Sequence, residues 1–245
     1  MDSDRRDRPR PRLGLLYPGH AAEDDYPALA VRALRRPVVE VIHTSVGEDA
    51  HRVDALLDLG GPARLGEGAA RLAGRVDAVV WACTSGSFVF GLEGARRQVA
   101  GIRDVAGVPA SSTSLAFVAA LRAVGATRPA IAATYPEDVV AAFVDFLGEA
   151  GIDVVAAGGE GIVTAAEVGT LGCDRVLSFV AAGDHPHADT VLVPDTALHT
   201  AGCLEELEAT LGKPVLTANQ VTLWEALRLA RANGRQPGLG TLFAA

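Results

Sequence analysis

The sequence predicts an α/β protein made of two pseudo-symmetric Rossmann-like lobes, each with a four-stranded parallel sheet and with the active site in the cleft between them. Short apolar runs alternate with stretches of helical periodicity along the chain. Features of the first half return in the second half. The 245 residues suffice for two lobes that each bury a core.

The strands are expected at short apolar runs that end in turn-forming or polar residues. The first run is closed by Pro18-Gly19, and the third leads directly into Cys83. Helical stretches separate the runs, and strand–helix–strand units join by right-handed crossovers, so the sheets are expected to be parallel. The expected strands are 13–17, 38–43, 77–82, 107–110, 129–134, 153–157 and 189–193, and 212–214 repeats the pattern of 107–109.

The helices are expected where apolar residues recur every three or four positions. Asp24 and Asp25 are suited to cap the first helix, and Gly60-Gly61-Pro62 separates the second from the third. The expected helices are about 24–34, 49–59, 66–73, 88–102, 111–124 and 137–150, one or two within 164–182, then 201–211 and 217–232.

An internal duplication is indicated by matching segments about 110 residues apart. Tyr17-Pro18 follows the first expected strand, and Tyr135-Pro136 follows the fifth. Cys83-Thr84 and Asp195-Thr196 likewise follow equivalent strands. The duplication predicts a lobe 1 of residues 13–112 and 217–235 and a lobe 2 of residues 113–216, with a disordered tail at 1–12 and a loose tail at 236–245.

The composition excludes several classes of function. A net charge of −8 argues against a general affinity for nucleic acid or for an anionic membrane, and no apolar run is long enough to span a bilayer. Three cysteines without CxxC spacing, and a start without a signal peptide, favour a reduced cytoplasmic setting. The expected partner is a small carboxylate substrate, and a homodimer is possible for such a fold.

Two candidate proton-transfer groups, Cys83 and Asp195, stand at equivalent strand ends. Parallel strands place their carboxyl ends at one edge, so the two groups are expected to face one substrate carbon from opposite sides of the cleft. This suits proton removal, proton return or thiolate addition. Hydroxyl groups nearby could bind a carboxylate, namely those of Tyr17, Thr84, Ser85, Tyr135 and Thr196.

Each candidate also has a structural interpretation. A buried cysteine is often inert, and Asp195, Thr84, Ser85 and Thr196 are ordinary helix-capping residues. The histidines show no metal-ligand spacing, and the glycine cluster 158–161 lacks a nucleotide-binding fingerprint. No metal or cofactor is therefore expected.

The chain resembles the aspartate/glutamate racemase superfamily, and within it the branch of maleate cis-trans isomerase and arylmalonate decarboxylase. The resemblance rests on residues 82–85 (ACTS), 133–139 (ATYPEDV), 212–215 (GKPV) and 223–229 (LWEALRL). It implies two pseudo-symmetric lobes, a cofactor-free active site between them and carboxylate substrates.

The resemblance also implies roles for individual residues. Cys83 matches the first catalytic cysteine of the racemases and maleate isomerases, and Thr84, Ser85 and Tyr135 match positions that bind a substrate carboxylate. Asp195 stands where these enzymes carry the second thiol. The decarboxylase has its one catalytic thiol at that second position and glycine at the first, which is the reverse of this chain.

The leading hypothesis is a cofactor-independent isomerase similar to maleate cis-trans isomerase. The Cys83 thiolate would add to the double bond of a small dicarboxylate, with Asp195 as proton shuttle or electrostatic partner. The alternatives are a lyase that decarboxylates a substituted malonate, a racemase that uses Cys83 and Asp195, and a non-catalytic carboxylate-binding protein.

Overall fold

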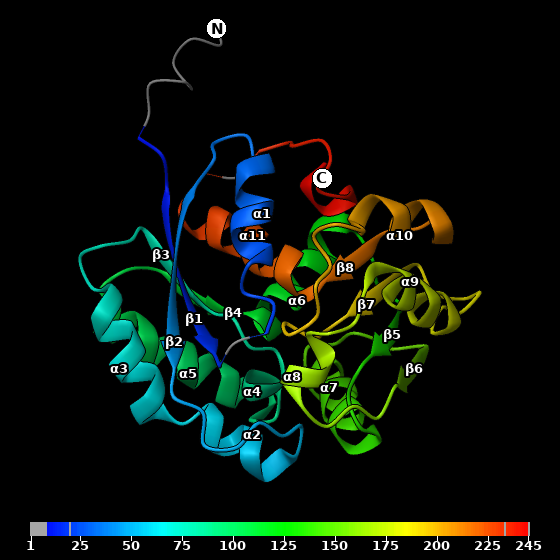
Figure 1. The fold of residues 1–245 in the computed structure, drawn as a ribbon, viewed down its shortest axis with the longest axis horizontal. Coiled ribbons are helices and arrows are strands. Elements are labelled where there is room, and N and C mark those ends of the chain that lie inside the picture. The colour runs from blue at the N-terminus through cyan, green and yellow to red at the C-terminus, as the bar shows by residue number, and fades with distance from the viewer. Residues whose placement is uncertain (1–8, 20, 233, 245) are drawn as a thin grey trace, which may run out of the picture.

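The computed structural model of the chain describes residues 9–19, 21–232 and 234–244. It contains two four-stranded parallel sheets with the same strand order, β2-β1-β3-β4 and β6-β5-β7-β8 (Figure 1). The predicted fold class is confirmed. The strands are β1 (Arg12–Pro18), β2 (Val38–Thr44), β3 (Ala78–Trp81), β4 (Ala110–Ser112), β5 (Pro129–Ala133), β6 (Ala156–Gly159), β7 (Thr190–Val193) and β8 (Val215–Thr217).

Helices cover both faces of the first sheet. α3 and α5 pack on one face, while α1 and α11 pack on the other. The helix α11 comes from the end of the chain, so lobe 1 is completed by residues that follow lobe 2. The helices of this half are α1 (Asp25–Arg32), α2 (Val53–Leu59), α3 (Pro62–Leu72), α4 (Ser85–Phe88), α5 (Gly91–Ala106), α6 (Thr113–Val124) and α11 (Ala218–Leu229).

The second sheet has two buried faces that belong to different cores. Along β5, Ile131 and Ala133 join the large core shared with lobe 1, whereas Ala130 and Ala132 face a smaller core with α9 and α10. The alternation follows from the two-residue period of a strand. The helices of this half are α7 (Glu137–Glu149), α8 (Ala165–Val168), α9 (Cys173–Ala182) and α10 (Leu204–Leu211).

One polar contact joins two helices of the first half, and another ties the lobes together. The hydroxyl groups of Thr113 on α6 and Thr222 on α11 lie 2.6 Å apart. The buried carboxylate of Asp25 on α1 accepts the N–H groups of Thr200 at 2.7 Å and Ala201 at 3.1 Å, and the side-chain amide of Asn219 at 3.1 Å. Asp25 therefore fixes the loop after β7 against lobe 1.

The segment after β3 becomes helical earlier than the sequence predicts. α4 starts at Ser85, two residues after Cys83, and Gly91 with φ of 66° separates it from α5. This backbone conformation is accessible to glycine at little cost, so Gly91 fixes the break. β4 also begins later than predicted, after Pro109, which has no N–H to donate to a strand ladder.

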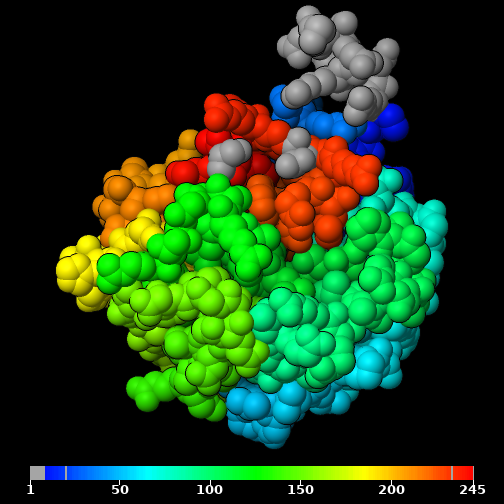
Figure 2. Space-filling view, turned by 180° about the vertical axis from the view of Figure 1, so that it is seen from behind, coloured from blue at the N-terminus to red at the C-terminus, as the bar shows by residue number. Residues whose placement is uncertain are grey.

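The C-terminal segment differs from the predicted loose tail at 236–245. It forms a 3₁₀ helix, η1 (Thr241–Phe243), and Leu239, Leu242 and Phe243 are buried. The amide of Gln220 on α11 donates to the Leu239 carbonyl at 2.7 Å. In Figure 2 the red C-terminal residues lie against the orange surface of α10 and α11. The glycine and proline residues of this segment are typical of a loop, so the sequence did not predict that it packs on the core.

The N-terminal tail predicted at 1–12 also ends earlier than expected. Residues 1–8 lie outside the described part of the chain, but Arg12 opens β1, and its N–H donates to the Asp77 carboxylate at 2.7 Å. Within the described residues, no helix is both long and apolar enough to cross a membrane.

Candidate active site

A cavity of about 240 Å³ lies at the carboxyl ends of strands from both sheets. Cys83 and Ser85 after β3 line it, together with Asp195 and Thr196 after β7 and Tyr17 in β1. The structure thus brings together five of the seven residues singled out in the sequence. Apolar side chains complete the wall, among them Val46, Leu56 and Leu59.

The Cys83 thiol is buried and lies at the start of α4. Its Sγ accepts the Gly86 N–H at 3.3 Å and lies 3.8 Å from the Ser85 hydroxyl. A Cβ at position 86 would lie 3.1 Å from Sγ, so the close approach of the backbone favours glycine there. Burial raises the pKa of Cys83 to about 12, and the Asp195 charge adds to the rise that Gly86 and Ser85 oppose. Cys83 is therefore a neutral thiol at neutral pH.

Alkylation tests this protonation state. At pH 7.5 we expect iodoacetamide to label the exposed Cys173 at least about 100-fold faster than Cys83, because only a thiolate reacts and burial hinders access. The rate of Cys83 alkylation should rise about tenfold per pH unit as long as the protein stays folded, since the pKa of the thiol lies near 12. Mass spectrometry of tryptic peptides measures both rates. Equal labelling of the two cysteines at pH 7.5 would show that Cys83 is ionised.

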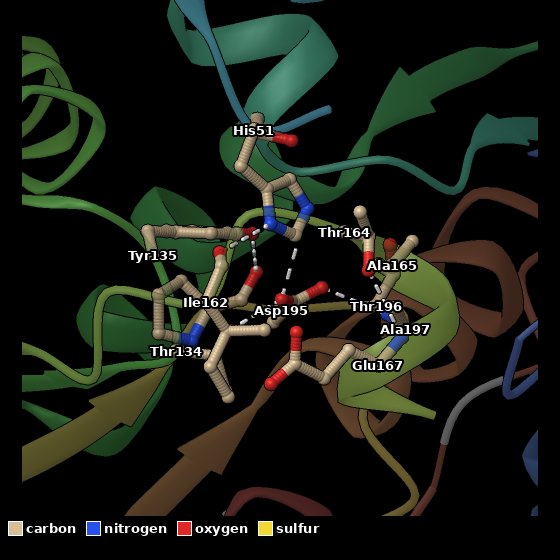
Figure 3. Close-up of polar contacts among 12 residues, drawn as sticks. His51, Thr134, Tyr135, Ile162, Thr164, Ala165, Glu167, Asp195, Thr196 and Ala197 are labelled. Atoms are coloured by element: carbon tan, nitrogen blue, oxygen red, sulfur yellow. Dashed lines mark hydrogen bonds and ion pairs between the residues drawn. The ribbon is translucent and has the colours of Figure 1, made fainter. Parts of the chain in front are cut away.

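Asp195 is 3% exposed and has three polar neighbours (Figure 3). Its Oδ1 accepts the Ala197 N–H at 2.9 Å, and its Oδ2 accepts a short hydrogen bond from the Thr134 hydroxyl. The Nε2 of His51 lies 3.9 Å from the same Oδ2. The carboxylate is therefore held in a fixed orientation in the cavity wall.

His51 is a site residue that the sequence analysis did not select. It is 6% exposed, its Nδ1 lies 3.2 Å from the Ile162 carbonyl, and its ring packs edge-on against Tyr135 with centroids 4.9 Å apart. The loop after β2 carries His51 across to lobe 2. The sequence could have indicated His51 by its position in the loop after β2, because the carboxyl end of β2 lies at the same edge of the sheet as the site.

The two tyrosines follow equivalent strands of the two sheets, but their hydroxyl groups have different partners. The Tyr17 hydroxyl donates to the Thr196 carbonyl at 3.0 Å and accepts the Ala22 N–H at 3.0 Å. The Tyr135 hydroxyl donates to the Pro194 carbonyl at 3.0 Å. Burial raises the pKa of both phenols well above the usual value. Both are therefore neutral hydroxyl groups at neutral pH.

Thr84 and Tyr135 do not line the cavity itself, unlike the other five predicted site residues. Thr84 is fully buried, and its hydroxyl has no hydrogen-bond partner among the described residues. A buried hydroxyl without a partner is costly, so a bound ligand group is a natural partner for it. In the described part of the chain, no three His, Cys, Asp or Glu side chains are grouped so that they could hold a metal ion.

A comparison with known protein families shows the family of this chain. A sequence model of the arylmalonate decarboxylase family matches residues 62–243. The chain belongs to this family. Arylmalonate decarboxylase from Bordetella bronchiseptica is 31% identical over 166 residues, which cover 65% of this chain and 68% of that protein. The predicted resemblance to this branch is confirmed, and the family is one of enzymes.

Solved structures of two kinds of enzyme share the fold. A liganded double mutant of arylmalonate decarboxylase, glycine to cysteine and cysteine to serine, has a TM-score of 0.86 at 25% identity and covers 95% of this chain and 98% of its own. The maleate isomerase from Pseudomonas putida S16 has a TM-score of 0.85 at 21% identity, with 97% and 99% covered. A maleate cis-trans isomerase mutant from Nocardia farcinica, with a covalently bound succinylcysteine intermediate, has a TM-score of 0.86 at 20% identity, with 96% and 99% covered.

Proposed function

We propose that this protein is a cofactor-independent decarboxylase of a malonate that carries an apolar substituent, and that Cys83 supplies the proton of the product. The single observation that carries the proposal is a buried thiol in the wall of the cavity, held neutral by that burial. A neutral thiol can donate a proton but cannot attack a double bond. Membership of the arylmalonate decarboxylase family supports the same reaction.

The proposed reaction has two steps. When the carbon–carbon bond to one carboxylate breaks, carbon dioxide leaves and the electron pair remains on the α-carbon as an enediolate. The Cys83 thiol then gives its proton to that carbon, and the thiolate regains a proton from water. Ser85, which lines the cavity, and Thr84, whose buried hydroxyl has no partner among the described residues, are proposed to bind the remaining carboxylate, where hydroxyl donors stabilise the developing charge. Tyr135 would join them if its hydroxyl left the Pro194 carbonyl. Val46, Leu56 and Leu59 would contact the substituent.

Isomerisation of maleate is the second candidate. The family resemblance assigns Cys83 to the first catalytic cysteine of maleate isomerases, and the Gly86 N–H would stabilise a thiolate once it had formed. With a pKa of about 12, however, on the order of one Cys83 thiol in 10⁵ is ionised at pH 7. Thiolate addition would therefore need the substrate to lower the pKa of the thiol, which a dianion opposes.

One assay separates the two reactions. The purified protein is incubated with phenylmalonate in one series and with maleate in another, and carbon dioxide, phenylacetate and fumarate are measured. We expect carbon dioxide and phenylacetate in equal amounts and no fumarate. Fumarate without carbon dioxide would establish the isomerase instead, and absence of both products would contradict the proposed function.

A further inference from the structure

A buried imidazole and a buried carboxylate face each other in the cavity wall, and the proposed reaction uses neither. His51 belongs to the loop after β2 in lobe 1, and Asp195 to the loop after β7 in lobe 2. Both line the cavity, and 3.9 Å separates Nε2 from Oδ2. Figure 3 shows the ring directly above the carboxylate.

The surrounding hydrogen bonds determine which atoms carry protons. A carbonyl oxygen can only accept, so the contact with Ile162 places a proton on Nδ1 of His51. Nε2 is then the nitrogen whose proton is variable, and it faces Asp195. The Thr134 hydroxyl and the Ala197 N–H both donate to the Asp195 carboxylate, so both of its oxygens act as acceptors. The two side chains are therefore placed so that a proton on Nε2 would make them an ion pair.

The other charged groups around the cavity already have partners. Glu48 pairs with Arg52 at 2.8 Å, and Asp49 accepts the N–H groups of Ala165 at 2.8 Å and Ala166 at 3.1 Å. Cys83 and Tyr135, which also face this region, are neutral at neutral pH. Among the described residues that line the cavity, none is Arg or Lys. Among the described residues of the lining, His51 is therefore the one side chain that can carry a positive charge opposite Asp195.

We propose that His51 is a positioning residue whose imidazolium balances the charge of Asp195, so that the cavity accepts a dianionic dicarboxylate. The choice of dicarboxylate rests on the proposed function. Without the imidazolium, the two charges of the substrate would meet the charge of the buried Asp195, and like charges repel more strongly near buried groups than in water. With it, the charge of Asp195 is compensated, and hydroxyl and N–H donors of the wall can bind the carboxylates.

Kinetics of a double-mutant cycle test the charge balance. With phenylmalonate, we expect His51→Gln to raise KM by about 10- to 100-fold while kcat stays within about threefold, because the charge acts on binding and not on proton transfer. Adding Asp195→Asn to this variant should lower KM again by about tenfold or more, since the uncompensated charge is gone. His199→Gln, which removes the surface histidine paired with Asp24 at 2.8 Å, is the matched control.

Two outcomes would overturn the proposal. One is a fall in kcat of His51→Gln at unchanged KM, which would make His51 a proton-transfer group. The other is a double variant whose KM equals that of His51→Gln, which would show that the charge of Asp195 is irrelevant to binding.

An NMR measurement tests the ion pair without turnover. In protein with ¹⁵N-labelled histidine at pH 7, we expect both ring nitrogens of His51 to be protonated in the wild type. In Asp195→Asn we expect Nε2 to lose its proton. The His51→Gln spectrum assigns the signals. An Nε2 without a proton in the wild type, or unchanged signals in Asp195→Asn, would refute the ion pair, whereas an intact ion pair with no decarboxylation would contradict only the proposed function.

Discussion

Cys83→Ala is expected to lower kcat for phenylmalonate by about 10²- to 10⁴-fold, the usual contribution of a positioned proton donor. Alanine keeps the backbone but removes the proton that the enediolate needs, and no other cysteine lines the cavity among the described residues. Initial rates of phenylacetate formation measure the loss. Full activity of this variant would exclude Cys83 as the donor.

The matched control is Cys203→Ala. Cys203 is also buried, but its thiol lies away from the cavity and contacts the Thr200 carbonyl at 3.7 Å. We expect this variant to lose some stability and to keep its turnover. Loss of activity in both variants would indicate damage to the fold, and circular dichroism of each protein distinguishes that case.

The stereochemistry of the product should show from which side the Cys83 thiol protonates the α-carbon. Because one thiol approaches the α-carbon, a malonate with two different substituents should give one enantiomer of the monocarboxylate, and D₂O should place one deuteron on that carbon. Chiral chromatography measures the ratio, and the residual product of Cys83→Ala should be closer to racemic. A racemic product from the wild type would contradict protonation from a single side.

Asp25→Asn is expected to lower the free energy of unfolding by about 2–4 kcal/mol. Asp25 is 5% exposed, and its Oδ2 accepts N–H groups from three residues of the loop after β7 and of α11. The asparagine side chain carries no charge, so its hydrogen bonds to these N–H groups are weaker than those of the carboxylate. If its NH₂ group turns toward the N–H groups, they lose their acceptor altogether.

Urea unfolding followed by circular dichroism measures this effect. Asp24→Asn is the control, because the Asp24 side chain is 77% exposed and its pair with His199 is a surface contact. We expect the control to change the unfolding free energy by less than about 1 kcal/mol. Equal effects of the two variants would show that the buried carboxylate does not tie the lobes.

Much of the fold follows from local patterns in the sequence. Apolar runs that alternate with helical periodicity predict seven of the strands, and the repeat of Tyr17-Pro18 at Tyr135-Pro136 predicts two similar lobes, whose sheets have the same strand order in the structure. β8 begins after 212–214, where the sequence shows only a repeat of the pattern at 107–109. The C-terminal segment could not be predicted in this way. Leu239, Leu242 and Phe243 are buried in the large core, where η1 packs on α6 and α11, which is a long-range effect.

The site could also be predicted only in part, because some of its residues come together through long-range contacts. Cys83 and Asp195 follow strands, and strand ends meet at one edge of a parallel sheet, so their placement follows from topology. His51 lies in a loop of 45–52, between β2 and α2, and reaches Asp195 because that loop pairs with lobe 2 through the contacts of Asp49 with Ala165 and Ala166. No periodicity or motif encodes that contact.

The position of α11 has a consequence for how the chain folds during synthesis. Nearly all of α11 is buried, and it covers one face of the sheet formed by the first strands. A ribosome delivers β1 to β4 and α1, which packs on the same face, long before α11, so part of that face stays uncovered until α11 has emerged. The first lobe made is therefore the last to be completed.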